Sequence, residues 1–263
     1  GLASAASEGG VRIAEQTTVL DYRAGVVTTS SGEVTGEVII DAMEGYRSQL
    51  PSTQRASLPL YSLMIATEPL PDKVFDALGL EHGMTFADFR SLVIYGQRTA
   101  DNRIAFGGRG APYHWGSRID PRYDRDPKVF RALESTLKDM FPQLGRVGIS
   151  HTWGGVLGVP RDWHSSVTFD QATGLGAAGG YVGDGVALSH LSGLTLADAI
   201  MGNPTSRTAL PFVGHQSPLW EPEPLRYLGS TAAILGVGLA DKIESTTGKT
   251  SLVSRLIAPL TGH

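Results

Sequence analysis

The stretch that most constrains this chain runs from Thr173 to Met201. It predicts a glycine-rich strand, a tight turn and then a helix that opens at Asp184-Gly185 and stops at Gly202-Asn203-Pro204. Asp184 is expected to cap the helix, and the glycines around it allow a sharp turn free of side chains. Apolar residues spread around the helix, so we expect it to be well buried. A helix start of this kind offers unpaired N–H groups to a phosphate or to the electron-rich edge of a cofactor ring.

Within this stretch, residues 174–179 match G-x-G-x-x-G literally. The dinucleotide-binding motif requires its glycines to lie between strand and helix, whereas here Gly180-Tyr-Val continues past the match. We therefore favour a close-packed glycine strand. A plain nucleotide-binding domain that uses these glycines stays as a weaker alternative, which a helix starting after Asp184 would reject.

Composition narrows the function classes. The 263 residues suffice for one large or two modest domains, and 22 basic against 26 acidic residues give 22 − 26 = −4, without a basic stripe. Nucleic acid is therefore not an expected partner. Cysteine is absent, which fits a cytoplasmic protein, and no segment is apolar and long enough for a membrane span. The seven histidines show no metal-ligand spacing, so we expect no metal.

The rest of the chain predicts a mixed α/β (α+β) fold. We expect strands at 11–15, 18–22, 26–29, 34–41, 60–67, 89–97, 102–107 and 147–158, and helices at 72–80, after Asp126-Pro127, at 225–239 and around 252–257. Val38–Ala42 is an apolar run suited to a strand covered on both faces. The leucine side of the tail helix is expected to pack on its own protein, with a dimer contact as the alternative.

Residues 107–115 hold the candidate catalytic groups. Gly107-Gly-Arg-Gly110 is either an anion site or a tight turn, and Tyr113, His114 and Trp115 follow at once. Arg109, Tyr113 and His114 combine charge, a titratable ring and flat apolar faces, as a small polar substrate needs. A structural role for His114 stays open. Trp153 is expected in the core, with a close approach to a ligand beside Gly154-Gly155 as the alternative. Arg161-Asp162 is either an internal ion pair or part of a site.

Two runs carry a resemblance to a known family: Trp153-Gly-Gly-Val-Leu-Gly-Val-Pro-Arg-Asp162 and Gly179-Gly-Tyr-Val-Gly-Asp-Gly-Val-Ala-Leu-Ser189. They resemble the D-amino-acid/glycine/sarcosine oxidase family of FAD-dependent oxidoreductases, nearest the gamma-glutamylputrescine-oxidase-like branch. Residues 95–101, 103–113 and 220–226 agree with that branch, so the resemblance covers nearly the whole chain.

The resemblance implies a partial Rossmann-like FAD domain plus an antiparallel-sheet substrate domain. We expect FAD-domain residues at 1–46, the substrate domain at 47–150, a return to the FAD domain at 151–210 and a helical tail at 211–263. It implies hydride transfer from an amine or amino acid to FAD. The cofactor-binding residues implied are Val19, Ala42, Gly45, Gly155, Gly180, Tyr181, Gly183, Asp184, Gly185 and Val186.

One part of the family pattern has no counterpart here. The strand–G-x-G-x-x-G–helix unit that cradles the FAD pyrophosphate is missing from these 263 residues, so we expect an upstream portion of the protein and weak or no FAD binding by this chain alone. A truncated, non-catalytic relative that acts as a ligand-binding or interaction module is the alternative function.

Overall fold

The computed structural model describes residues 1–249 and 251–253, without the side chain of Arg109. Its helices are α1 (Leu2–Glu8), α2 (Asp72–Leu78), α3 (Pro127–Met140), α4 (Gly185–Ile200) and α5 (Leu225–Thr247), with short 3-10 turns at η1 (Glu44–Gln49), η2 (Trp115–Ser117), η3 (Pro121–Asp124) and η4 (Pro142–Leu144). Its strands are β1 (Val19–Arg23), β2 (Val26–Thr29), β3 (Gly32–Thr35), β4 (Ile39–Asp41), β5 (Leu58–Thr67), β6 (Thr85–Ala87), β7 (Ile94–Arg98), β8 (Ile104–Arg109), β9 (Ile149–Val159), β10 (Ser166–Asp170) and β11 (Leu175–Gly179). This is the mixed α/β fold with antiparallel sheets that the sequence predicts.

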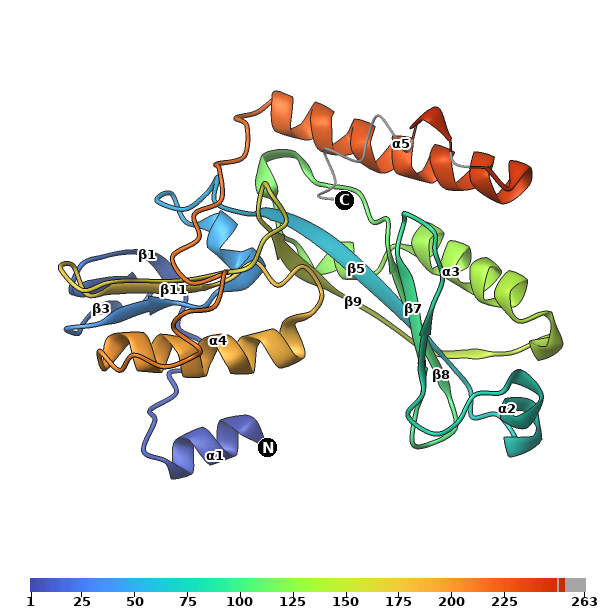
Figure 1. Cartoon of the computed structure of the whole chain (residues 1–263), viewed down its shortest axis with the longest axis horizontal. Helices are drawn as coiled ribbons and strands as arrows, with labels where there is room; N and C mark the ends of the chain where they lie inside the picture. Colours follow the sequence, from blue (N-terminus) through green and yellow to red (C-terminus); the bar gives the residue numbers. More distant parts are fainter. Residues whose placement is uncertain (250, 254–263) are drawn as a thin grey trace.

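The largest layer is a five-stranded antiparallel sheet in the order β6-β7-β8-β5-β9. Its long central pair runs in register from Leu58↔Val159 to Thr67↔Ile149. Helix α3 covers the sheet (Figure 1), and its Leu133 and Leu137 enter the main core. As predicted, Asp126 caps this helix by accepting the N–H of Lys128 at 2.8 Å, and Pro127 takes the first helical position.

A second, smaller layer combines β4 with two strands from much later in the chain. β11 pairs in parallel with β4 and antiparallel with β10, and α4 packs on this sheet through Leu196. Gly176 permits that contact, since a Cβ there would lie 3.3 Å from Leu196 Cδ1. β1, β2 and β3 form a separate antiparallel meander.

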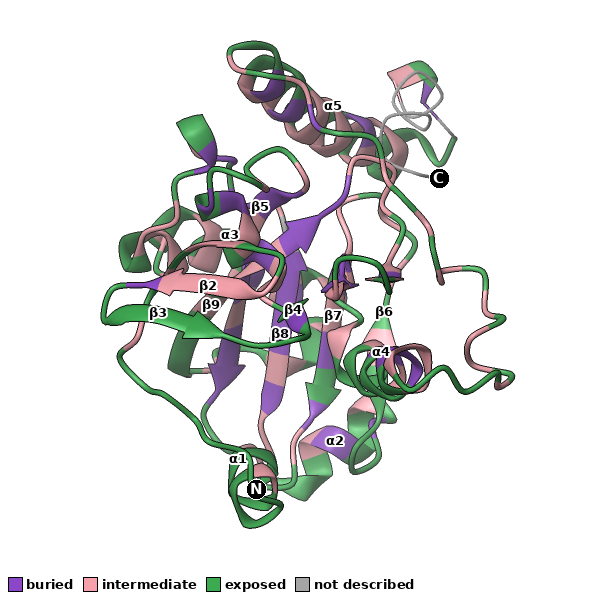
Figure 2. Cartoon of the chain, turned by 90° about the vertical axis from the view of Figure 1, so that its left-hand side faces the viewer, coloured by how far each residue is buried: buried purple, intermediate pink, exposed green. Residues whose placement is uncertain are grey.

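Three expectations about this layer are wrong. Residues 11–15 form no strand, and β4 lies at the edge of its sheet with Ile40 47% exposed, so it is not covered on both faces. Helix α4 is not well buried: Ser192, Thr195 and Leu196 are its buried residues, and Figure 2 shows most of it exposed or intermediate. A sheet of three short strands offers too little area to cover an apolar helix on several sides.

The chain then crosses back to α5, which lies over the upper end of β5 (Figure 1). The backbones of Arg55 and Trp220 are joined at 2.9 Å, and Trp220 Nε1 donates to the Val159 carbonyl at 2.8 Å. The leucine side of α5 does not pack on the protein as expected: Leu225, Leu228, Leu235 and Leu239 are each more than half exposed. The opposite side, rich in small residues, faces inward instead. The expected helix around 252–257 lies mostly outside the described residues, and Leu252 and Val253 are helical.

No helix within residues 1–249 and 251–253 combines the length and the apolar composition that crossing a membrane requires.

Candidate functional site

The turn before α4 presents backbone donors to solvent. Gly180 and Gly183 adopt φ values of +76° and +105°, which side chains rarely tolerate, and the helix begins at Gly185 as predicted. Asp184 occupies the N-cap position but forms no side-chain cap bond, so its expected capping role is wrong. Among the residues the structure covers, no acceptor takes the N–H groups of Gly185, Val186 or Ala187. This helix start therefore keeps its donors and partial positive charge available.

The carboxyl group of Glu44 is hydrogen-bonded to the same turn. Its carboxylate accepts the N–H of Tyr181 at 2.9 Å and that of Gly180 at 3.2 Å. Burial raises the pKa of Glu44, while the two N–H donors oppose that shift. Glu44 reaches this place with a left-handed φ of 49°, beside Gly158, which has no room for a side chain.

A buried carboxylate fixes the loop that carries Glu44. Asp41, at the end of β4, is 3% exposed and accepts from Arg47 Nη2 at 3.0 Å, from Tyr22 Oη at 2.9 Å and from the N–H of Met43 at 3.1 Å. Burial, together with the charge of Asp41, raises the pKa of Tyr22 to about 12, so its hydroxyl stays a donor at neutral pH. The loop after β4 is thus held in one arrangement against the turn before α4.

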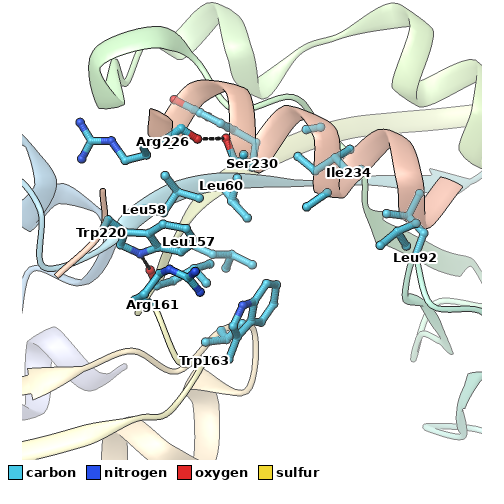
Figure 3. Close-up of a pocket in the computed structure, with 18 of the residues that line it drawn as sticks. Leu58, Leu60, Leu92, Leu157, Arg161, Trp163, Trp220, Arg226, Ser230 and Ile234 are labelled. Atoms are coloured by element: carbon cyan, nitrogen blue, oxygen red, sulfur yellow. Dashed lines mark hydrogen bonds between the residues drawn. The ribbon is translucent and has the colours of Figure 1, made fainter. Parts of the chain in front are cut away.

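A cavity of about 510 Å³ lies next to this turn, under α5 (Figure 3). Its walls are mostly apolar and come from β5, β9, the loops around residues 91–92, 110–111 and 160–163, and the inner side of α5. The lining includes Leu58, Leu60, Leu92, Leu157, Val159, Trp163, Val182, Trp220, Gly229, Ala233, Ile234 and Val237. An apolar cavity of this size with few polar groups is typical of a small-molecule site.

Val182 joins the cavity to the turn. It is 7% exposed, packs with Leu58, Val159 and Trp220, and immediately precedes Gly183. The exposed N–H donors at the start of α4 therefore lie directly beside the cavity, on the far side of Val182. The charged residues of the cavity lining are Arg161 and Glu221, which form an ion pair with Nε–Oε1 at 3.1 Å, and Arg226, which lies 3.4 Å from Glu223.

The structure brings one group of predicted cofactor-binding residues together. Gly180, Tyr181, Gly183, Asp184, Gly185 and Val186 form the turn and helix start, with Val186 93% exposed. Buried Gly45 lies against Val156 of β9, where a Cβ would come within 3.1 Å. Exposed Ala42 precedes Glu44, while Val19 opens β1 and Gly155 lies in β9 with open space around it.

The candidate catalytic residues are neighbours in the sequence, but Tyr113 and His114 contact different parts of the structure. Tyr113 is 2% exposed, and its hydroxyl bonds to Glu223 Oε1 at 2.7 Å. His114 turns elsewhere: its ring stacks on Tyr123 with centroids 3.3 Å apart, and burial lowers its pKa. Arg109 ends β8, and the next residue, Gly110, lines the cavity. The Arg109 side chain is outside what the structure describes.

Two further expectations are corrected. Arg161 and Asp162 do not pair with each other; Arg161 pairs with Glu221, and Asp162 Oδ2 lies 2.7 Å from His215 Nε2. Trp153 is 41% exposed and is therefore not a core residue.

Residues 174–179 are not a phosphate loop. They form β11 and the turn before it, their backbone is engaged by β4 and β10, and the helix starts six residues later, at Gly185. This geometry rejects the plain nucleotide-binding alternative.

Sequence reasoning missed Glu44, Trp163, Trp220 and Glu221. Glu44 had a usable signal, since it follows β4 at the carboxyl end of a strand, where ligands collect in α/β sheets. Trp163, Trp220 and Glu221 come together only because the residues around 220 pack against β9 and the loop after it. No local sequence pattern indicates that long-range contact.

Comparison with known proteins agrees with this geometry. The FAD dependent oxidoreductase family model (DAO) matches residues 1–199. The chain is 32% identical over 213 residues to the probable oxidoreductase OrdL of Haemophilus influenzae. This match covers 77% of this chain and 46% of that protein. It is 31% identical over 184 residues to the gamma-glutamylputrescine oxidoreductase of Escherichia coli, covering 68% of this chain and 40% of that one.

Among solved structures, glycine oxidase from Geobacillus kaustophilus superposes with a TM-score of 0.67 at 21% identity, over 82% of this chain and 56% of that one. This likeness shows a shared fold. The chain spans about half the length of the curated relatives it matches. Since the family model covers most of the chain, the chain belongs to the family of FAD-dependent oxidoreductases.

Proposed function

We propose that this chain is the substrate-binding and flavin-ring part of an enzyme that oxidises a small-molecule amine or amino acid with FAD. The observation that carries the proposal is the junction at Val182, where an apolar cavity of about 510 Å³ adjoins a helix start with available N–H donors. Bound FAD supplies the acceptor for the hydride that leaves the carbon next to the substrate nitrogen.

The residues at the α4 start fit the electron-rich edge of a flavin. Gly183 and Gly185 carry no side chain that would block approach, and the N–H groups of Gly185 and Val186 have no acceptor among the described residues. The bonds from Gly180 and Tyr181 to Glu44 support the view that this turn stabilises negative charge. Under this proposal Gly180, Tyr181, Gly183, Asp184, Gly185 and Val186 hold the ring, while Val19, Ala42, Gly45 and Gly155 contribute elsewhere in the FAD site.

We assign different roles to the three candidate catalytic residues. Arg109 and His114 remain proposals for substrate contact. Tyr113 is a positioning residue: its buried hydroxyl holds Glu223, whose carboxylate also accepts the N–H of Gly116 and that of Tyr227. That network fixes the start of α5 above the cavity.

The pyrophosphate of FAD would need contacts from outside residues 1–263, because the glycine run at 174–179 is committed to a sheet. We propose residues 1–46 and 151–210 as the part near FAD, 47–150 as the substrate part and 211–263 as a helical tail whose helix α5 roofs the cavity. The boundary at 150/151 falls inside β9, so that strand would serve both. We place the protein in the cytoplasm, consistent with a chain that has no cysteine.

The test is anaerobic mixing of FAD-loaded protein, expressed from its complete reading frame, with a panel of amines and amino acids. The expected result is loss of oxidised-flavin absorbance with at least one of them. Binding of amines without any flavin reduction would favour the ligand-binding module instead.

A further inference from the structure

The exposed side chains of α5 between residues 225 and 242 form one narrow line along the helix. Their spacing alternates between three and four residues, which is the spacing of the a and d positions of a coiled coil. We call this line the α5 seam, and its members are Leu225, Leu228, Ala232, Leu235, Leu239 and Lys242. A line this narrow is typical of contact with a single helix, whereas packing on a core produces a wider apolar side.

The other charged residues of this part of α5 face inward. Arg226 lies 3.4 Å from Glu223, and Asp241 accepts the N–H groups of Ser91 and Leu92, each at 2.8 Å. These contacts anchor both ends of the helix to its own protein. They leave the seam, with its four leucines each more than half exposed, on the outside of the molecule (Figure 1).

The positions beside the seam have no charge. They correspond to the e and g positions of a coiled coil, where charged residues usually select the partner. Here they are Gly229, Thr231, Gly236 and Gly238. A Cβ added at Gly229 or Gly238 meets nothing within 4 Å, so a second helix can approach closely. No charge at these positions repels an identical copy of the seam.

The single charge in the seam favours one direction of pairing. In a parallel pair of identical helices, the two Lys242 side chains would lie side by side, and like charges repel. In an antiparallel pair, Lys242 of each copy instead lies opposite Leu225 of the other. Glu221 precedes that end of the helix, and its side chain is 42% exposed. The charges are therefore complementary only when the two helices run in opposite directions.

The sizes of the seam residues are also complementary in the antiparallel direction. When the midpoint lies between positions 233 and 234, Leu228 meets Leu239 and Ala232 meets Leu235. The small Ala232 side chain leaves room for Leu235 near the centre, as large and small residues do in interdigitating helices. All four leucines of the seam gain an apolar partner in this register.

We propose that the α5 seam is an interface between two copies of this chain, which pair antiparallel about a two-fold axis. The inference goes beyond the proposed function and stands independently of it. A two-fold pair is closed, since both copies use the same surface. Because the inner side of α5 lines the cavity, the second copy also supports the roof of that cavity from outside.

Sedimentation velocity of the 263-residue chain is the first test. One helix pair is smaller than a standard interface, so we expect a dimer with a dissociation constant of about 1–100 μM. Leu235→Lys places a charge near the centre of each seam and should weaken the dimer at least about tenfold. Leu219→Lys makes the same change at an exposed leucine before α5 and should leave the dimer unchanged.

Crosslinking at single cysteines tests the direction of pairing, because the chain has no cysteine of its own. In the antiparallel pair, Ala232→Cys lies close to the same residue of the second copy, and a short bismaleimide should link the two. Leu225→Cys faces position 242 instead, so it lies about 25 Å along the helix axis from its counterpart and should not be linked.

Three results would overturn the proposal. The first is a chain that stays monomeric up to about 300 μM, well above the expected dissociation constant. The second is a dimer that Leu235→Lys and Leu219→Lys weaken equally, which would place the interface elsewhere. The third is crosslinking of Leu225→Cys as readily as Ala232→Cys, which would exclude antiparallel pairing. Circular dichroism checks that each variant is folded, and Leu228→Lys replaces Leu235→Lys if that variant loses helix.

Discussion

The two layers of the molecule differ in how completely they bury their own apolar side chains. The five-stranded sheet and α3 enclose a core in which Leu63, Ile65 and Phe106 are fully buried. The β4–β11–β10 sheet and α4 share a thin core of Val167, Ala178 and Leu196, and Val186, Leu194 and Met201 remain exposed. The first layer is a densely packed scaffold. The second leaves backbone donors and apolar side chains exposed, as the proposed contact with a flavin requires.

The largest expected effect tests the scaffold side of this comparison. Phe106→Ala should lower the free energy of unfolding by about 3–5 kcal/mol, because a 0% exposed ring leaves a cavity that rigid neighbours cannot fill. Leu196→Ala in the thin core should lower the free energy of unfolding by about 2 kcal/mol. This is the low end of the range for a buried leucine, because a thin layer can relax around the lost side chain. Urea unfolding measures both, and equal losses would contradict the difference between the layers.

A second, smaller effect tests the turn before α4. Gly180→Ala strains a left-handed residue and places a Cβ 2.5 Å from Pro160 Cγ. Gly214, with φ +75° and open space around it, is the matched control, for which the backbone alone should cost about 1–2 kcal/mol. Thermal or urea unfolding should show Gly180→Ala losing at least about 1 kcal/mol more, from overpacking. If the two alanine variants unfold alike, the turn is not tightly packed on Pro160.

The smallest effect concerns the charge at that turn. Because burial raises the pKa of Glu44 above its ordinary value of 4.5, the stability it contributes is complete at low pH and is lost as the pH rises through the raised value. Glu44→Gln mimics the protonated acid, so the variant should gain stability relative to the native protein as the pH increases from about 4 to about 7. Urea unfolding across this range is the measurement, with exposed Glu8→Gln as the baseline. A difference that does not vary with pH would show that Glu44 is not strained in its charged form.

The sequence carried the local features of this fold and missed the long-range ones. Asp126-Pro127 predicts the start of α3, and the pair Glu134–Lys138, at 2.6 Å, follows from its spacing along that helix. The position of the α4 start can be predicted from the glycines before it. The exposure of α4 cannot be predicted in this way, because it depends on the width of the sheet that β4 and β10 form with β11.

The candidate site divides in the same way. The Gly180–Val186 turn is contiguous, so the sequence predicts its shape, and its role in binding stays a prediction. The cavity instead needs β5, β9, the 160–163 loop and α5 to meet. The leucine pattern of α5 is misleading, since the cavity is lined largely by Gly229, Ala233, Ile234 and Val237, whereas Leu228, Leu235 and Leu239 are exposed. Periodicity identifies the two sides of a helix but not which one the protein covers.

We propose that this chain contacts the ring end of FAD and that its phosphate end is bound elsewhere. The most direct measurement is the affinity of residues 1–263 for lumiflavin, FAD and ADP, followed by flavin fluorescence and, for ADP, by competition. We expect weak binding, with the affinities for lumiflavin and FAD within about threefold of each other and no competition by ADP. Stoichiometric FAD in the purified chain, or competition by ADP, would instead place the phosphate site within these residues.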